Sequence, residues 1–238
     1  MAGGIMRKGH QCGMLWGASL AVGAEAHERF EDPDQAKVVA LSTSQHVVAS
    51  FVNRTSTVSC REITGVNMES VFGMARFMVS TMIKGMNNSL CFNLAEEWAP
   101  EAALSGQEGM DVTPDDVPSP CHNCASEVVR KMGGTAEEEV MVAGFAGGIG
   151  LSGKGCGALA AAIWMKTLAF CKENPGKNPP FLNNRDAKHL IDVFEKNTKG
   201  EYECQHIVGR TFTSPSEHSD YIEKGGCKAL IEALCADE

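Results

Sequence analysis

The sequence predicts a mainly α-helical protein made of two pseudo-symmetric helical modules that arose by internal duplication. Three observations support this prediction. Long segments carry apolar residues at spacings of three and four, strand-like patterns are confined to two short stretches, and the chain repeats itself at a fixed offset. With 238 residues, 43% of them hydrophobic, the chain is long enough to bury a sizeable core.

The repeat is visible when the chain is aligned with itself at an offset of 144 residues. Nine of the 17 positions from Ala2 to Ala18 are then identical, whereas about one identity is expected by chance at ordinary residue frequencies. The same offset aligns Cys60 with Cys204, and a gap of eight residues then aligns Cys91 with Cys227. The chain therefore holds two copies of one module, each with three cysteines in the same order.

The two copies differ in completeness. We expect a truncated first module at residues 1–110, a proline-rich linker at 111–120 and a complete second module at 121–238. The first module is called truncated because the chain begins at a glycine-rich segment that lies well inside the second copy.

Six segments have the periodicity, caps or breaker residues of helices. They are residues 12–29, 68–84 and 90–104 in the first module and 156–172, 185–196 and 226–236 in the second. Within 68–84, methionines recur near helical spacing and are expected to fill the core: Met68, Met74, Met78 and Met82. Only Val38–Leu41 and Val47–Val52 are expected to be strand-like.

Charge and hydropathy exclude two classes of partner. The formal net charge is −9 and no basic block is present, so we expect no nucleic-acid binding and no attraction to an anionic membrane. No apolar run reaches the roughly 18 residues of a membrane span. The apolar stretch 12–22 resembles an export signal, but it is the counterpart of an internal segment, which favours a cytoplasmic protein.

The unusual number in the composition is the ten cysteines. Such a count fits structural disulfides, metal or cluster ligation, or thiol redox chemistry. In a reducing compartment structural disulfides are disfavoured, which leaves the other two.

A glycine-rich run, 144–153, precedes a cysteine in the second copy. It lacks the Gly-Lys-Ser/Thr ending of a phosphate loop, and the residues before it read as helix, so we do not expect nucleotide binding. We expect instead a backbone that approaches a cofactor closely, with amide groups facing cluster or cysteine sulfur. The candidate cofactor-binding glycines are Gly147, Gly148 and Gly157 in the second copy and Gly3, Gly4 and Gly13 in the first.

The cysteine motifs of residues 121–238 resemble those of the C_GCAxxG_C_C family, which is described as redox-active. The motifs are Asn123-Cys124-Ala125, Cys156-Gly157-Ala158 after a Gly-Gly pair, Cys204 and Cys227. The first copy matches with Cys12-Gly13, Cys60-Arg61-Glu62-Ile63 and Cys91, and lacks the first cysteine. The sequence departs from the family pattern at Ala161, where a glycine is usual, and at Met14, where an alanine is usual.

The resemblance extends to the split-Soret cytochromes, which contain the same domain together with c-type haem and an iron–sulfur centre. Covalent haem requires Cys-x-x-Cys-His. The motif Cys121-His122-Asn123-Cys124 is followed by Ala125 instead, so no covalent haem is expected.

Four cysteines are the predicted metal ligands of the second copy. Cys124, Cys156, Cys204 and Cys227 are separated by 32, 48 and 23 residues, so they must come from different elements rather than from one local knuckle. Soft thiolates suit an iron–sulfur cluster, [2Fe-2S] or [4Fe-4S], as well as zinc or copper(I). His122 and His206 neighbour predicted ligands and either ligate metal, donate to sulfur or face solvent.

The first copy supplies only three predicted ligands, Cys12, Cys60 and Cys91. Cys121 is either their fourth partner or a surface thiol. Cys171 and Cys235 lie among apolar residues and are expected in the core.

Three functions are compatible with these residues. The first is a cytoplasmic iron–sulfur redox protein that transfers electrons to an unknown partner protein. The second is a thiol–disulfide enzyme or sensor, and the third is a zinc-stabilised helical protein that binds a partner. A homodimer is compatible with all three, and no serine–histidine–acid set points to another enzyme class.

Overall fold

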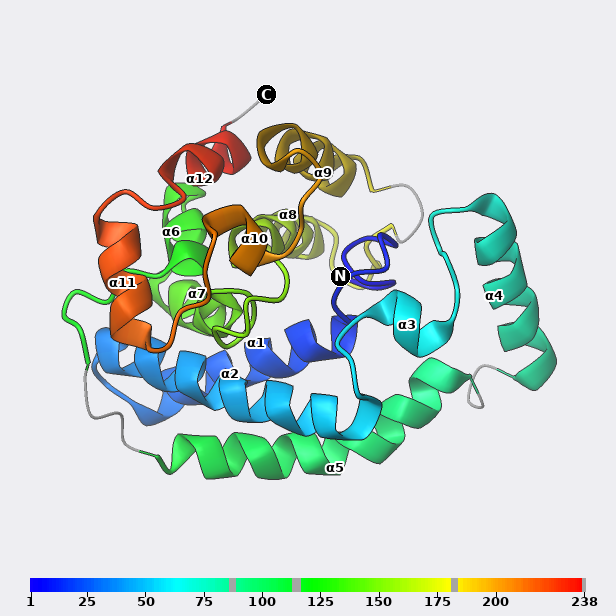
Figure 1. The fold of residues 1–238 in the computed structure, drawn as a ribbon, viewed down its shortest axis with the longest axis horizontal. Coiled ribbons are helices and arrows are strands. Elements are labelled where there is room, and N and C mark those ends of the chain that lie inside the picture. The colour runs from blue at the N-terminus through cyan, green and yellow to red at the C-terminus, as the bar shows by residue number, and fades with distance from the viewer. Residues whose placement is uncertain (86–88, 113–116, 181–183, 237–238) are drawn as a thin grey trace.

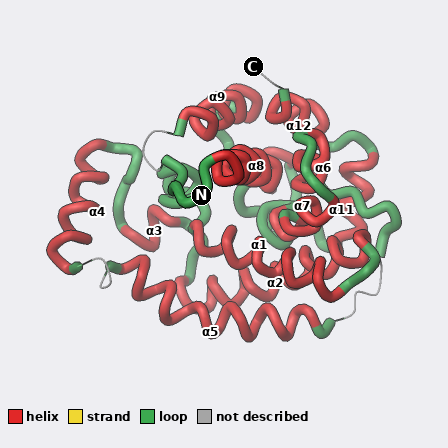
Figure 2. The backbone as a smooth tube through the Cα atoms, turned by 180° about the vertical axis from the view of Figure 1, so that it is seen from behind, coloured by secondary structure: helices red, strands yellow, loops and turns green. Residues whose placement is uncertain are grey.

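The structure is a computed structural model that describes residues 1–85, 89–112, 117–180 and 184–236. In these ranges the regular structure consists of twelve α-helices and one short 3-10 helix, and Figure 2 shows no strand. A single bridge between Gln11 and Ser59 is the β-type pairing found there. The prediction of a mainly α-helical protein is confirmed. Residues 113–116 of the predicted linker lie outside the described ranges.

The helices of the two copies follow one another along the chain (Figure 1). The first copy contains α1 (Gly13–Arg29), α2 (Pro33–Thr55), α3 (Cys60–Thr64), α4 (Val71–Lys84) and α5 (Leu90–Met110). The second contains α6 (Cys124–Lys131), α7 (Ala136–Met141), the 3-10 helix η2 (Ala143–Phe145), α8 (Gly157–Glu173), α9 (Arg185–Thr198), α10 (Cys204–Val208), α11 (Pro215–Glu223) and α12 (Lys228–Cys235).

The duplication is present in the structure as well as in the sequence. Helices α1, α3 and α4 begin 144 residues before α8, α10 and α11, respectively. Backbone hydrogen bonds repeat with them, since Gly9 N donates to Gly3 O over 3.0 Å and Gly153 N donates to Gly147 O over 2.9 Å. Helices α6 and α7 precede the repeated unit of the second copy and have no counterpart among the described residues of the first copy.

The two predicted strand-like stretches are wrong, because both lie in α2. This helix packs against α1, α5, α7 and η2, so apolar residues are needed on several of its faces. Val38, Val39, Val47 and Val48 are all buried. Burial on several faces hides the helical period, and β-branched residues then imitate a strand.

The two copies share one hydrophobic core. Helix α7 and η2, from the second copy, pack on α1 and α2 of the first. Trp16 of α1 meets Phe145 of η2 edge to face, with ring centroids 5.0 Å apart. Gly23 of α1 lies so close to α7 that an added Cβ would meet the Met141 carbonyl oxygen at 2.2 Å. The copies are therefore interlocked.

Helix α4 projects from this body (Figure 1) and exposes apolar side chains. Phe72 is 82% exposed and Met82 is 81% exposed. The predicted core role is therefore correct for the buried Met68 and wrong for Met78 and Met82. Among the described residues, no helix has both the length and the apolar character that crossing a membrane requires.

Candidate cysteine sites

The four predicted cysteines of the second copy lie together, each at the start of a different helix. Cys124 is the first residue of α6 and Cys204 the first of α10. Cys156 and Cys227 are the N-cap residues of α8 and α12. All four line one small, mostly apolar cavity of about 10 Å³. Residues spread over more than 100 positions of sequence are thus brought to one point by four helix N-termini.

The start of α6 is fixed by the buried side chain of Asn123. Its Oδ1 accepts hydrogen bonds from the backbone N–H groups of Ala125 and Ser126, at 3.0 and 3.2 Å. Its Nδ2 donates to the Ala143 carbonyl oxygen at 2.9 Å. This cap orients the first turn of α6, and with it Cys124.

Burial dominates the electrostatics of these thiols. It raises the pKa of Cys156 to about 12, even though the backbone N–H groups of Leu159 and Ala158 oppose the shift. Burial also raises the pKa of Cys124 well above its usual value, and the neighbouring thiols of the group raise it further. The thiols are therefore protonated near neutral pH, and a bound cation would displace their protons.

Hydrogen-bond donors face three of the four sulfur atoms, those of Cys124, Cys156 and Cys227. The Gly147 N–H group faces the Cys124 sulfur and lowers its pKa. The Tyr221 hydroxyl does the same for Cys227, whose pKa burial raises. Gly157, another predicted cofactor-binding glycine, lines the cavity itself. Donors of this kind stabilise thiolate or cluster sulfur.

The glycine-rich loop has an unusual backbone in both copies. Five consecutive residues have positive φ, from Gly147 to Leu151 in the second copy and from Gly3 to Arg7 in the first. Left-handed backbone costs roughly 1–2 kcal/mol for each residue with a side chain. Ile149 and Leu151, the two such residues of the second loop, are both buried in the core, which offsets this cost.

The remaining candidate glycines mainly shape these loops. An added Cβ on Gly148 would meet the Lys154 amide nitrogen at 2.6 Å, and one on Gly4 would meet the Cys60 Cβ at 2.7 Å. Gly4 thus lies beside a predicted ligand, whereas Gly148 supports the loop. The nearest neighbours of Gly3 and Gly13 are Arg7 and Met1 rather than a cysteine.

The three cysteines of the first copy also gather at helix starts. Cys12 is the N-cap of α1, Cys60 the first residue of α3 and Cys91 the second residue of α5. Burial raises the pKa of Cys60 to about 12, and the thiols of Cys12 and Cys91 raise it further. The backbone N–H groups of Met14 and Leu15 face the Cys12 sulfur, as those of the equivalent residues do in the second copy.

Cys121 does not complete this group. Its backbone N–H group donates to Asp34 Oδ1 over 3.0 Å, and Asp34 and Lys37 flank its thiol at the start of α2. The start of α2 lies beside the end of α1, whereas Cys12 caps the opposite end. A 17-residue helix such as α1 is about 25 Å long at 1.5 Å per residue. Cys121 is buried, so it is not a surface thiol either.

The two remaining cysteines differ from each other. Cys171 is exposed, so its predicted place in the core is wrong; it lies in the second half of α8, which leaves the core. Cys235 is half-buried and packs against the core, with its sulfur 3.8 Å from the Val128 carbonyl oxygen of α6.

One side chain at the site is not predicted by any motif in the sequence. His218 of α11 lines the four-cysteine cavity, packs edge to face on Phe212 and is 2% exposed. Burial lowers its pKa to about 4, and its Nδ1 has no hydrogen-bond partner. The first copy has a methionine at the equivalent position, so the repeat gave no signal for it.

The two histidines that the sequence did single out lie elsewhere. His122 Nδ1 is 3.6 Å from Glu127, and His206 Nδ1 is 3.2 Å from Glu201. Neither lines the cavity. In the described part of the chain, no three His, Cys, Asp or Glu side chains are arranged to hold a metal ion as they stand.

Fold and site together define a class of protein: an all-helical duplication whose buried cysteines lie at helix N-termini behind a left-handed glycine loop. The family described as "Putative redox-active protein (C_GCAxxG_C_C)" matches residues 1–135 and, a second time, residues 119–236. The chain belongs to this family. No curated protein and no solved structure matched the chain.

Proposed function

We propose that this chain is an electron-transfer protein that binds an iron–sulfur cluster through Cys124, Cys156, Cys204 and Cys227. The observation that carries the proposal is the convergence of these four thiols, from four helix starts, on one buried cavity. The family's description as redox-active supports the same chemistry.

The residues at the site fit such a group. Four thiolates are the usual ligand set of a cluster, and the positive ends of α6, α8 and α12 favour the negative charge that the thiolates would carry. The wall between them is largely apolar and includes Ile207 and Leu230. Because the cavity has room for about one water molecule, cluster binding would have to enlarge it.

A bound cluster would supply one-electron redox chemistry. The surrounding residues would set its reduction potential and its exposure to water. The Gly147 N–H group and the Tyr221 hydroxyl would donate to ligand sulfur, which raises the reduction potential. The apolar wall of the cavity would keep water away from the cluster. Cys227 is the least buried ligand, so we place electron exchange on its side of the site.

A reducing setting such as the cytoplasm suits this proposal, because all ten cysteines are free. The partner would then be another redox protein that docks near Cys227. The Arg210 guanidinium lies 5.0 Å from the centroid of the Phe212 ring, which lines the cavity.

The proposal is tested by purifying the chain and two variants without oxygen. Cys156→Ala should lose the visible charge-transfer absorption and most of the bound iron, because one ligand is gone. Cys171→Ala removes an exposed thiol outside the site and should keep both. Equal absorption in the two variants would exclude the proposed ligand set.

Thiol–disulfide exchange is the second candidate function, because the same sulfur atoms crowd around a cavity of only about 10 Å³. The raised pKa values oppose it, since a protonated buried thiol is a poor nucleophile. Mass spectrometry distinguishes the two. Reversible loss of two hydrogen atoms per cysteine pair in an iron-free protein would favour the exchange reaction.

A further inference from the structure

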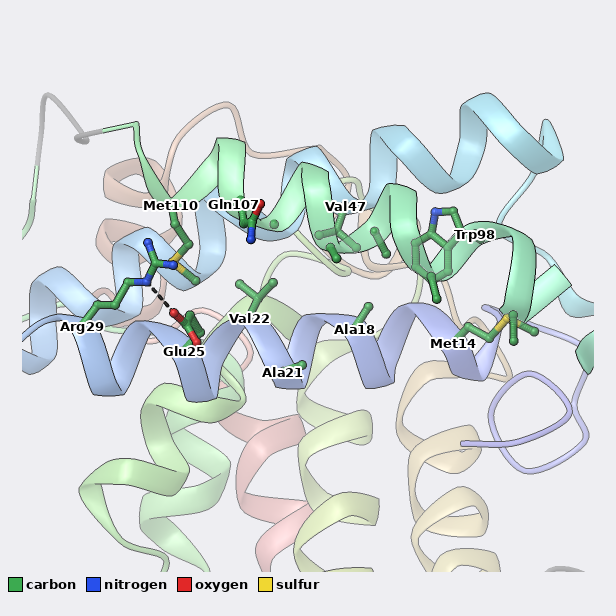
Figure 3. A pocket seen from close by; sticks show the side chains of 15 residues that line it. Met14, Ala18, Ala21, Val22, Glu25, Arg29, Val47, Trp98, Gln107 and Met110 are labelled. Carbon is green, nitrogen blue, oxygen red and sulfur yellow. Dashed lines mark hydrogen bonds and ion pairs between the residues drawn. The ribbon is translucent and has the colours of Figure 1, made fainter.

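An apolar groove of about 470 Å³ runs between α1 and α5 (Figure 3). Its α1 wall includes Met14, Ala18 and Val22. Its α5 wall combines small residues such as Ala99 and Ala103 with the larger Trp98, Gln107 and Met110. The two helices run in the same direction, so the groove follows both from their first turns towards their ends (Figure 3).

The second copy shows what belongs in this place. There α8 and α12 are the counterparts of α1 and α5, and α6 packs against both of them. The burial of equivalent residues differs accordingly. Ala158 and Ala162 of α8 are 1% and 0% exposed, whereas their counterparts Met14 and Ala18 are only half-buried. No described element of the first copy corresponds to α6, and the groove lies between the counterparts of the two helices that α6 contacts.

One contact locates the missing helix more closely. In the second copy, the Cys235 sulfur of α12 lies 3.8 Å from the Val128 carbonyl oxygen of α6. The alignment that pairs Cys91 with Cys227 also pairs Ala99 with Cys235. Ala99 lines the groove and is exposed. Cys235 thus contacts α6 in the second copy, whereas its counterpart Ala99 is exposed in the first.

The groove begins at the incomplete cysteine group. Met14 is two residues after Cys12, and Ala95 is one helical turn after Cys91. In the second copy α6 starts with Cys124, which stands beside the other three thiols. Among the described residues, the first copy has no counterpart of α6 or of Cys124, which in the second copy belong to one element.

We propose that the groove between α1 and α5 binds an amphipathic helix of a partner protein, whose first turn carries a cysteine that joins Cys12, Cys60 and Cys91. The role of that cysteine rests on the proposed function, whereas the docking of the helix does not. The apolar face of the helix resembles that of α6, where Ala125, Val128 and Val129 are fully buried at spacings of three and four.

The test uses the full chain and a fluorescently labelled peptide with the sequence of residues 121–135, in which serine replaces Cys121. The peptide should bind saturably. Ala103→Arg in the groove should weaken binding at least about tenfold, because the new side chain blocks the apolar wall. Ala169→Arg, at an exposed position of α8, is the matched control and should bind as the native chain does.

Mild oxidation with a diazenedicarboxamide then locates the peptide. A disulfide to Cys12 or Cys91, identified by mass spectrometry, is expected, and replacing the peptide cysteine with serine should remove it without loss of binding. Absence of binding, or binding that Ala103→Arg leaves unchanged, would overturn the proposal. So would a native dimer that Ala103→Arg dissociates, because a second copy would then fill the groove. If the native chain holds a cluster but the peptide does not bind, this inference fails while the proposed function stands.

Discussion

At the scale of single residues, the chemistry of this protein depends on thiols that burial holds in the protonated form. Cys60 and Cys156, one in each copy, have pKa values raised to about 12. Such thiols are inert towards electrophiles but bind a soft cation well once their protons leave. The exposed thiol and the buried candidate ligands are thus different members of the ten cysteines.

This separation predicts the order of alkylation in metal-free folded protein. With iodoacetamide at pH 8, Cys171 should react first, because it is exposed, and Cys156 should react about tenfold or more slowly. Peptide mass spectrometry at successive times measures both. In denaturant the two rates should converge, and rapid labelling of Cys156 in the folded chain would contradict the burial described above.

Some residues of the two cysteine groups could be predicted from the sequence, and others could not. The repeat identified six of the seven cysteines that form two groups, and the family resemblance added Cys124, because helix starts and glycine loops are local features. It did not place Cys121, whose position depends on which end of α1 the chain returns to. Nor did it find His218, which enters the cavity from α11 without a repeated motif.

At the scale of elements, the left-handed glycine loop is the most constrained part of each copy. It connects the start of one cysteine helix to another, since the Gly153 carbonyl oxygen accepts from the Gln205 N–H group of α10. The glycines in the sequence indicate the loop but not its handedness. Two parts of α2 resemble strands in the sequence, because neighbours on several faces hide the helical period.

Two glycine substitutions test the packing of this loop. Gly148→Ala combines a φ of +82° with a Cβ placed 2.6 Å from backbone, and should cost more than about 3 kcal/mol of unfolding free energy. Gly133→Ala has a φ of +77° and open space around it, so it should cost only about 1 kcal/mol. Urea unfolding measures both. Equal costs would mean that the loop is not closely packed.

At the scale of the whole molecule, the two copies form one core rather than two separate domains. Helix α7 and η2 of the second copy fill the space against α1 and α2. The duplication can be predicted from the sequence, but the packing of one copy into the other cannot. This packing depends on a pair of short helices, α7 and η2, that belongs to the second copy. The same asymmetry leaves the groove of Figure 3 open.

A substitution in α1 tests the interlocking. Gly23→Ala would push a Cβ to within 2.2 Å of the Met141 carbonyl oxygen and should destabilise the whole chain by about 3 kcal/mol or more. Gly17→Ala, in the same helix, meets no atom within 4 Å and should stabilise the chain by up to about 1 kcal/mol. Denaturant curves followed by circular dichroism should show one transition in both variants. Two transitions would indicate copies that fold separately.

We propose that the four thiols of the second copy hold an iron–sulfur cluster. Iron and acid-labile sulfide, measured per chain in native protein prepared without oxygen, test it most directly. We expect iron and sulfide in equal amounts, with at least one cluster per chain and a thiol titre reduced by the ligands. A colourless protein with no iron and all ten cysteines titrating after unfolding would contradict it.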